Sequence, residues 1–138
     1  MLAKDLMRRE VISVRDDQPI EEVNEMLLRE HIHGVPVLDA EGDLVGMVTQ
    51  QDIFFSFATL TREQADGSPA RGAQERLFVR DVMTSPAVSA SEETDVRALS
   101  RMMHRLRIHR VPIVHEGELT GIVSSLDVCA AVARGDLP

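Results

Sequence analysis

HIHGVPVLDAEGDLVGMVTQQD at residues 31–52 and RIHRVPIVHEGELTGIVSSLD at residues 107–127 are two copies of one pattern. From residue 26 the copies align at an offset of 76, and six of the first thirteen positions are identical. After the turn the offset is 75, because the second turn is one residue shorter, and five of twelve positions are identical. A short block, DLM at residues 5–7 and DVM at 81–83, keeps the offset of 76. Three ordered blocks at one period indicate an internal repeat.

Each copy predicts the order β-α-β-β-α, because β-branched runs and helical spacing alternate in the same way. The expected strands are residues 11–14, 35–38 and 44–49 in copy one and 87–90, 111–114 and 119–124 in copy two. The apolar stripes of the expected middle helices are Ile20, Val23 and Leu27 in copy one and Val96, Leu99 and Met103 in copy two. Pro19 suits the first helical position, and Ser91 or Thr94 is the expected cap in copy two. The last helices are expected at about residues 50–58 and 125–133, and residues 5–7 and 81–83 at short turns or helices.

The repeat divides the chain into copy one at residues 1–58, a linker at 59–78 and copy two at 79–138. Each copy offers one small sheet and two short amphipathic helices, too little to bury a dry core alone. We therefore predict a mixed α/β (α+β) fold. In it, two β-α-β-β-α copies pack sheet to sheet with pseudo-two-fold symmetry and with clefts between them. The polar linker predicts a surface connector more readily than a binding lid.

Composition excludes several classes of protein. Hydrophobic residues make up 43% of the 138 residues, so a folded core is expected. The net charge of -8 and the absence of Trp and Tyr disfavour nucleic acid, which needs cations and stacking platforms. Without a long apolar run or a signal peptide, we expect no membrane partner and a cytoplasmic location. The single cysteine, Cys129, excludes an internal disulfide, and its apolar neighbours predict a place in the core.

The repeated pattern resembles that of cystathionine-β-synthase (CBS) domains, and two copies in tandem resemble a Bateman module. Val-Pro-hydrophobic, a turn with Gly, and Gly-hydrophobic-Val-Thr/Ser-x-x-Asp occur twice in register, and Asp-Val-Met-Thr stands at residues 81–84. The resemblance covers about residues 3–58 and 79–133. It implies a regulatory module, not an enzyme, which binds an adenosyl ligand such as AMP, ADP, ATP or S-adenosylmethionine. It also implies a homodimer that modulates an attached protein or a partner in trans.

Two aspartates are the strongest candidates for ligand contacts. Asp52 and Asp127 follow Thr49 and Ser124 by three residues, where a strand passes into a helix. A carboxylate there can accept hydrogen bonds from both ribose hydroxyls, and the hydroxyl and free N–H groups of the first turn can face a phosphate. The resemblance assigns Asp52 and Asp127 to ribose and Thr49 and Ser124 to phosphate or ribose. Alternatively, all four residues only cap their helices.

An apolar wall for adenine is expected beside the Val-Pro pairs. The resemblance implies that backbone beside the prolines reads the adenine edge and that aliphatic side chains sandwich the ring. The residues assigned to this wall are Val11, Ile12, Val35, Pro36, Ala87, Val88, Val111 and Pro112. Plain core packing is an equally good explanation for the aliphatic side chains.

The two copies differ at positions where the resemblance implies phosphate contacts. His109 and Arg110 precede the second Val-Pro pair, whereas copy one has Gly34 in place of the arginine. Thr84 also matches a position near the ligand. Copy one has Arg8 there, which is either a substitute phosphate contact or, as we expect more readily, only a surface charge. The two sites are therefore expected to be inequivalent.

Metal binding and catalysis are not expected. Histidines 31, 33, 104 and 109 lie near the motifs, but no cysteine or carboxylate cluster completes a ligand set. No nucleophile elbow, phosphate-binding loop or zinc-protease helix is present. The alternative to ligand binding is a dimerisation or docking module without a ligand. The support for such a module, and for the homodimer, is an aromatic cluster in the last helix of copy one. Phe54, Phe55 and Phe57 cannot all face inward, so some of them are expected on the surface.

Overall fold

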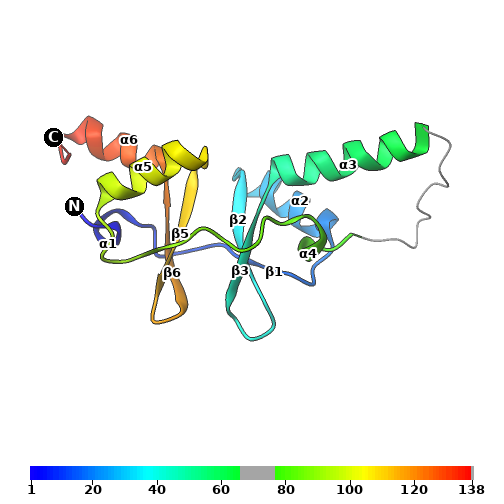
Figure 1. Ribbon diagram of the computed structural model, residues 1–138, viewed down its shortest axis with the longest axis horizontal. Helices are drawn as coiled ribbons and strands as arrows, with labels where there is room; N and C mark the ends of the chain where they lie inside the picture. The colour runs from blue at the N-terminus through cyan, green and yellow to red at the C-terminus, as the bar shows by residue number, and fades with distance from the viewer. Residues whose placement is uncertain (66–76, 138) are drawn as a thin grey trace. The chain divides into compact units, whose positions relative to one another are not determined.

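A computed structural model describes residues 1–65 and 77–137, and the side chains of all of these except 59–65. In the described residues, short strands form two three-stranded sheets and helices lie between the strands in the chain. The expected mixed α/β class is therefore confirmed (Figure 1). The first half contains α1 (Ala3–Leu6), β1 (Val14–Arg15), α2 (Ile20–Arg29), β2 (Gly34–Leu38), β3 (Leu44–Thr49) and α3 (Gln50–Ala65). The second half contains α4 (Val79–Val82), β4 (Ala90–Ser91), α5 (Val96–Leu106), β5 (Arg110–His115), β6 (Glu118–Ser124) and α6 (Ser125–Arg134).

Both sheets have the same topology. In the order β1-β2-β3 the first pair is parallel and the second antiparallel, and β4-β5-β6 repeats this arrangement. Gly34 lies opposite Thr49 in the first sheet, and Arg110 lies opposite Ser124 in the second. Corresponding residues of the two copies thus occupy the same register in their own sheets.

The middle helices cover the sheets as their sequence stripes predict. Ile20, Val23 and Leu27 of α2 and Val96, Leu99 and Met103 of α5 are buried. Strand residues of the same copy complete each core, including Val35 and Val48 in the first and Val111 and Val123 in the second.

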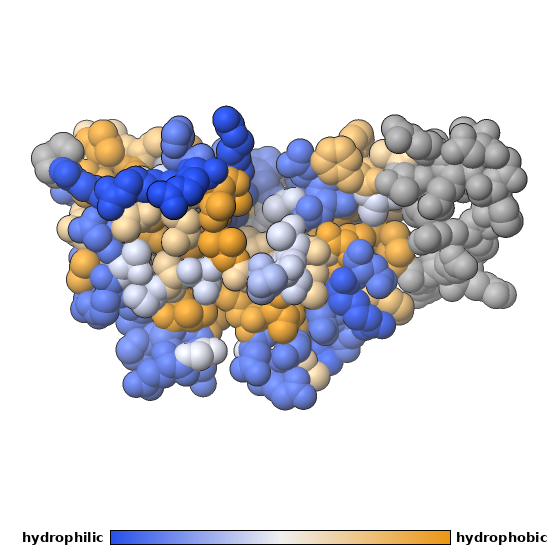
Figure 2. Space-filling model, in the orientation of Figure 1, coloured by the Kyte–Doolittle hydropathy of each residue, from blue (hydrophilic) through white to orange (hydrophobic). Residues whose placement is uncertain are grey.

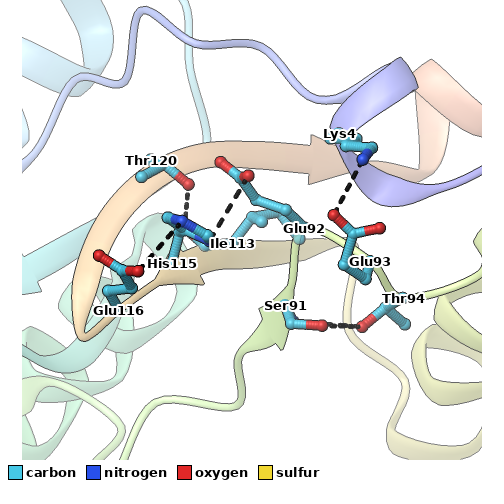
Figure 3. A network of polar contacts seen from close by, with 9 residues as sticks. All are labelled: Lys4, Ser91, Glu92, Glu93, Thr94, Ile113, His115, Glu116 and Thr120. Carbon is cyan, nitrogen blue, oxygen red and sulfur yellow. Dashed lines mark hydrogen bonds and ion pairs between the residues drawn. The ribbon is translucent and has the colours of Figure 1, made fainter.

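Helix starts depart from the prediction at two places. Pro19 is the N-cap of α2 and not its first helical residue. Asp95 caps α5, since its Oδ1 accepts the N–H of Arg97 at 2.8 Å. The expected caps Ser91 and Thr94 instead bond to each other, with 3.0 Å between their hydroxyl oxygens (Figure 3).

The first strand of each copy starts later than expected. Residues 11–13 and 87–89 are not in strands, because pairing with the neighbouring strand begins only at Val14, opposite Val37, and at Ala90, opposite Ile113. Helix α3 is also longer than expected and takes in residues 59–65 of the predicted linker. Residues 66–76 of that linker lie outside the described part of the chain, so its role as connector or lid stays a prediction.

The chain packs as two compact units whose boundaries differ from those of the repeat. One unit contains residues 1–12 and 88–138, and the other contains residues 13–87. Each copy begins with a short lead-in, residues 1–12 in copy one and 79–87 in copy two, and each lead-in packs on the opposite copy. Ala3 and Met7 belong to the core built on β5 and β6, and Val79 belongs to the core built on β2 and β3.

Polar contacts hold both lead-ins in place. Lys4 Nζ is 2.9 Å from an oxygen of Glu93 (Figure 3), and the N–H of Arg8 donates to Ile122 at 2.9 Å. In the other unit, Thr84 and Met47 exchange backbone hydrogen bonds at 2.8 and 3.0 Å.

Two glycines leave room for these lead-ins. A Cβ at Gly46 would stand 2.7 Å from the carbonyl oxygen of Thr84, and one at Gly121 would collide with the side chain of Met7. The close approach of the lead-in backbone thus requires glycine at position 46, and the packing of the Met7 side chain favours it at position 121.

Candidate functional site

The start of α6 is a reciprocal capping arrangement. Ser124 Oγ accepts the N–H of Asp127 at 3.2 Å, and Asp127 Oδ2 accepts the N–H of Ser124 at 2.9 Å. The N–H of Ser125 donates to the carbonyl of His109 at 2.8 Å. Two of the first three helical N–H groups thus have partners inside the protein, which leaves few of them for a phosphate.

The start of α3 repeats this arrangement in the other unit. Thr49 Oγ1 accepts the N–H of Asp52 at 3.2 Å, and Asp52 Oδ2 accepts the N–H of Thr49 at 2.9 Å. The N–H of Gln50 donates to the carbonyl of His33 at 2.9 Å. All four predicted hydroxyl and carboxylate residues therefore have the geometry of caps. A ribose contact would have to use the second oxygen of each carboxylate.

The second carboxylate oxygen distinguishes the two units. Asp127 Oδ1 is 3.2 Å from Nε of Arg8, whose side chain is 73% exposed, while that of Asp127 is 10% exposed. Asp52 Oδ1 has no hydrogen-bond or ion-pair partner among the residues described. The two aspartates thus share a cap but differ in the charge beside them.

Arg110 is a half-buried cation. It lies opposite Ser124 on the neighbouring strand, so the two side chains share a face of the sheet. Val111 and Val123 point into the core, so this face is the one turned away from the core. Within the described chain Arg110 has no hydrogen bond or ion pair, and burial lowers its pKa from the ordinary arginine value. An arginine stays protonated even so, so this charge is partly desolvated and available to an anion.

The corresponding position in the other unit has no side chain. Gly34 lies opposite Thr49, and a Cβ at Gly34 would stand 3.0 Å from Thr49 Cγ2. The tight approach of the two strands therefore favours glycine, and no cation can stand there without a shift.

Thr84 and His109 lie in different units. Thr84 is exposed and belongs to residues 13–87, with Thr49 and Asp52, although the repeat places it in copy two. His109 is exposed and belongs with Arg110, Ser124 and Asp127. Arg8, at the position that matches Thr84, also belongs to this second group.

The predicted adenine wall separates into two kinds of residue. Val35 and Val111 are in the cores, so their side chains are not free for a ligand, and Pro36 and Pro112 beside them are also buried. Val11 and Ala87 are half-buried, whereas Ile12 and Val88 are 42% and 38% exposed. Core packing thus explains the two strand valines, and the residues before β1 and β4 are the accessible ones.

A comparison with protein families identifies the repeat. The family model of the CBS domain matches residues 3–58 and 79–134. The chain belongs to the CBS domain family. The predicted tandem CBS pair is thereby confirmed.

Solved CBS structures have the same fold. The CBS domain pair of protein MJ0100, in complex with 5'-methylthioadenosine and S-adenosyl-L-methionine, is 24% identical, with a TM-score of 0.80 and 98% of each chain covered. CBSX2 in complex with AMP is 22% identical, with a TM-score of 0.80, and the match covers 99% of this chain and 98% of that one.

A sequence relative is the inosine-5'-monophosphate dehydrogenase of Korarchaeum cryptofilum, 34% identical over 128 residues. The match takes in 91% of this chain but only 23% of the enzyme, so the chain corresponds to about a quarter of that protein.

The sequence did not predict the ion pair between Arg8 and Asp127. The signal was present as a mismatch, since Arg8 stands where copy two has Thr84. It could not be interpreted because the exchange of lead-ins places Arg8 on copy two.

No group of three potential metal ligands occurs in residues 1–65 and 77–137. His33 instead bonds to Gln50 Oε1 at 3.0 Å. Among the described helices, none has the length and apolar character needed to cross a bilayer.

Proposed function

We propose that this CBS pair is a non-catalytic regulatory module of the cytoplasm that binds an adenosyl ligand and thereby modulates a partner protein in trans. The ligand class is AMP, ADP, ATP or a molecule similar to S-adenosylmethionine. The complexes of MJ0100 and CBSX2 with such ligands support the class.

The main support for the proposal is that Arg110 is half-buried and has no acidic partner in the described chain. A partly desolvated guanidinium without an acidic partner costs free energy, which an anionic ligand would offset. It stands across from Ser124, which is bonded to Asp127, so a cation, a hydroxyl and a carboxylate are gathered at one strand-to-helix junction. Ribose, held by Asp127, and phosphate, held by Arg110 with Ser124 and His109, are the groups that fit this set.

The unit of residues 13–87 would bind differently. Asp52 would hold ribose, with Thr49 and Thr84 as hydroxyl partners, and no arginine stands at the Gly34 position. We therefore assign phosphate-bearing ligands to the junction at α6. The junction at α3 would bind the uncharged adenosyl portion.

Calorimetric titration with AMP and adenosine tests the assignment. Arg110→Ala should weaken AMP about tenfold or more and leave adenosine nearly unchanged, because only AMP carries a phosphate. Asp127→Ala should weaken both ligands at the junction of α6 through the shared ribose, while the junction at α3 keeps its own carboxylate, Asp52. Equal weakening of AMP and adenosine by Arg110→Ala would refute the phosphate role.

Exposed aromatic side chains favour a second candidate function, a dimerisation or docking module without a ligand. Phe54, Phe55 and Phe57 are 67%, 58% and 41% exposed, and apolar surface is visible over α3 (Figure 2). We expect a homodimer under either function, because water-exposed aromatic surface favours association. Light scattering measures the dimer. If no adenine compound raises the heat-denaturation midpoint, the docking function is preferred.

A further inference from the structure

We propose that Arg8 makes the junction at α6 selective for phosphate-bearing ligands over nucleosides. This inference rests on the proposed adenosyl binding and adds the residue that sets the ligand class. Arg8 stands at the position that matches Thr84, and its effect comes from its contact with Asp127, the carboxylate assigned to ribose.

The first step is the occupancy of Asp127. Its Oδ2 is bonded to the N–H of Ser124 at 2.9 Å, and its Oδ1 is 3.2 Å from Nε of Arg8. A ribose hydroxyl that approaches Oδ1 must therefore compete with a guanidinium. A nucleoside has no anionic group that could bind the displaced guanidinium, so this competition weakens nucleoside binding.

A ligand phosphate changes this competition, because it offers Arg8 a second partner. The hydrogen bond of Arg8 to Asp127 uses Nε, and within the described chain no hydrogen bond of the terminal guanidinium nitrogens occurs. The side chain is 73% exposed, so it can turn without disturbing packing. A phosphate offers its oxygens to the planar fork of the guanidinium, which binds such groups with two parallel hydrogen bonds. The ligand thus releases Asp127 for ribose by drawing Arg8 to itself.

The third step is the backbone that positions Arg8. Its N–H donates to Ile122 at 2.9 Å and its carbonyl accepts from Ile122 at 3.0 Å, so the residue is paired along β6. Ile122 is two residues before Ser124, which places Arg8 beside the capping pair while Arg110 stands across from it. Arg8 thus contacts Asp127 while Arg110 lies opposite the Ser124 that caps with it, and an anion at this junction would meet both positive charges.

The test is a ratio of dissociation constants, measured calorimetrically with AMP and adenosine on the full chain. Every protein in this test also carries Asp52→Asn. This substitution removes the carboxylate assigned to ribose at the junction of α3, so that binding at the junction of α6 is measured. Arg8→Gln should tighten adenosine about two- to fivefold, as expected for removal of an exposed ion pair. It should weaken AMP about fivefold, so the preference for AMP falls tenfold or more. Arg9→Gln removes the same charge one residue away and should leave the preference unchanged.

The outcomes separate the two proposals. If Arg8→Gln shifts both ligands by one factor, or if Arg9→Gln lowers the preference equally, the role of Arg8 is wrong and adenosyl binding stands. If the Asp52→Asn parent binds neither ligand, adenosyl binding at α6 fails and the role of Arg8 falls with it. Arg8→Gln keeps the backbone pairing with Ile122, and an unchanged heat-denaturation midpoint without ligand verifies the fold.

Discussion

The starts of α3 and α6 have the same capping geometry and different surroundings. Thr49 with Asp52 and Ser124 with Asp127 form the same pair of hydrogen bonds, at 3.2 and 2.9 Å in both. Yet arginines stand near one pair, and a glycine stands opposite the other. The repeat thus keeps the backbone geometry of the junction, while neighbouring residues decide its charge.

The largest effects should come from the two cores, which we expect to be equally intolerant of a cavity. Leu27→Ala and Leu99→Ala should each lower the free energy of unfolding by about 2–5 kcal/mol, because both side chains are fully buried. Urea denaturation measures the loss. Leu28→Ala is the matched control, since Leu28 is exposed and its truncation should cost less than about 0.5 kcal/mol. A cost near the control value for either buried leucine would show that the cores are not equivalent.

The two lead-in contacts should differ in tolerance. Gly46→Ala should cost about 1–3 kcal/mol, because the new methyl group meets the backbone carbonyl of Thr84. Gly121→Ala should cost less, because the obstacle is the flexible side chain of Met7. Heat denaturation ranks the two variants, and the reverse order would contradict this explanation.

The two caps should be equal in stability even though their charges differ. Thr49→Ala and Ser124→Ala should each cost about 1 kcal/mol, since each removes one hydroxyl acceptor at the same distance. Ser125→Ala is the control, because the Ser125 side chain has no hydrogen bond in the described part of the chain. A cost for Ser124→Ala more than twice that for Thr49→Ala would contradict the equality of the two caps.

The smallest effect should be the pH dependence of the ion pair at Lys4. Its hydrogen bond to Glu93, with the charge of that carboxylate, raises the pKa of Lys4. A raised pKa means that the contribution to stability is fully present below the ordinary lysine value and is lost as pH rises through the folded value. Lys4 is the single lysine of the chain, so NMR can follow its titration without overlap. Glu93→Gln should lower this pKa, and an unmoved titration would contradict the contact.

Sequence periodicity predicted the features that depend on local physics. The stripe at Ile20, Val23 and Leu27 faces the core because helical spacing places these side chains on one face. The hydroxyl and the carboxylate three residues apart form a cap, because this spacing lets each side chain reach the backbone N–H of the other residue. The adenosyl roles of these residues stay predictions.

Features that depend on contacts between distant segments were not predictable. The ion pair of Arg8 with Asp127 joins residues 119 positions apart. Cys129 was expected in the core and is exposed, because α6 buries only Ala131 and presents other apolar side chains to water. Its apolar neighbours did not reveal which face of α6 packs.

The exchange of lead-ins also sets an order of events during synthesis. Residues 13–87 form a continuous unit and have every partner of their core once Ala87 has been made. Residues 1–12 leave the ribosome before residues 13–87 but must wait for residues 88–138. We therefore expect residues 1–12 to acquire their structure after residues 13–87, since domains fold as soon as their contacts exist. Pulsed hydrogen exchange on ribosome-bound chains should protect the amide of Val48 before that of Arg8, and the opposite order would contradict this sequence of folding.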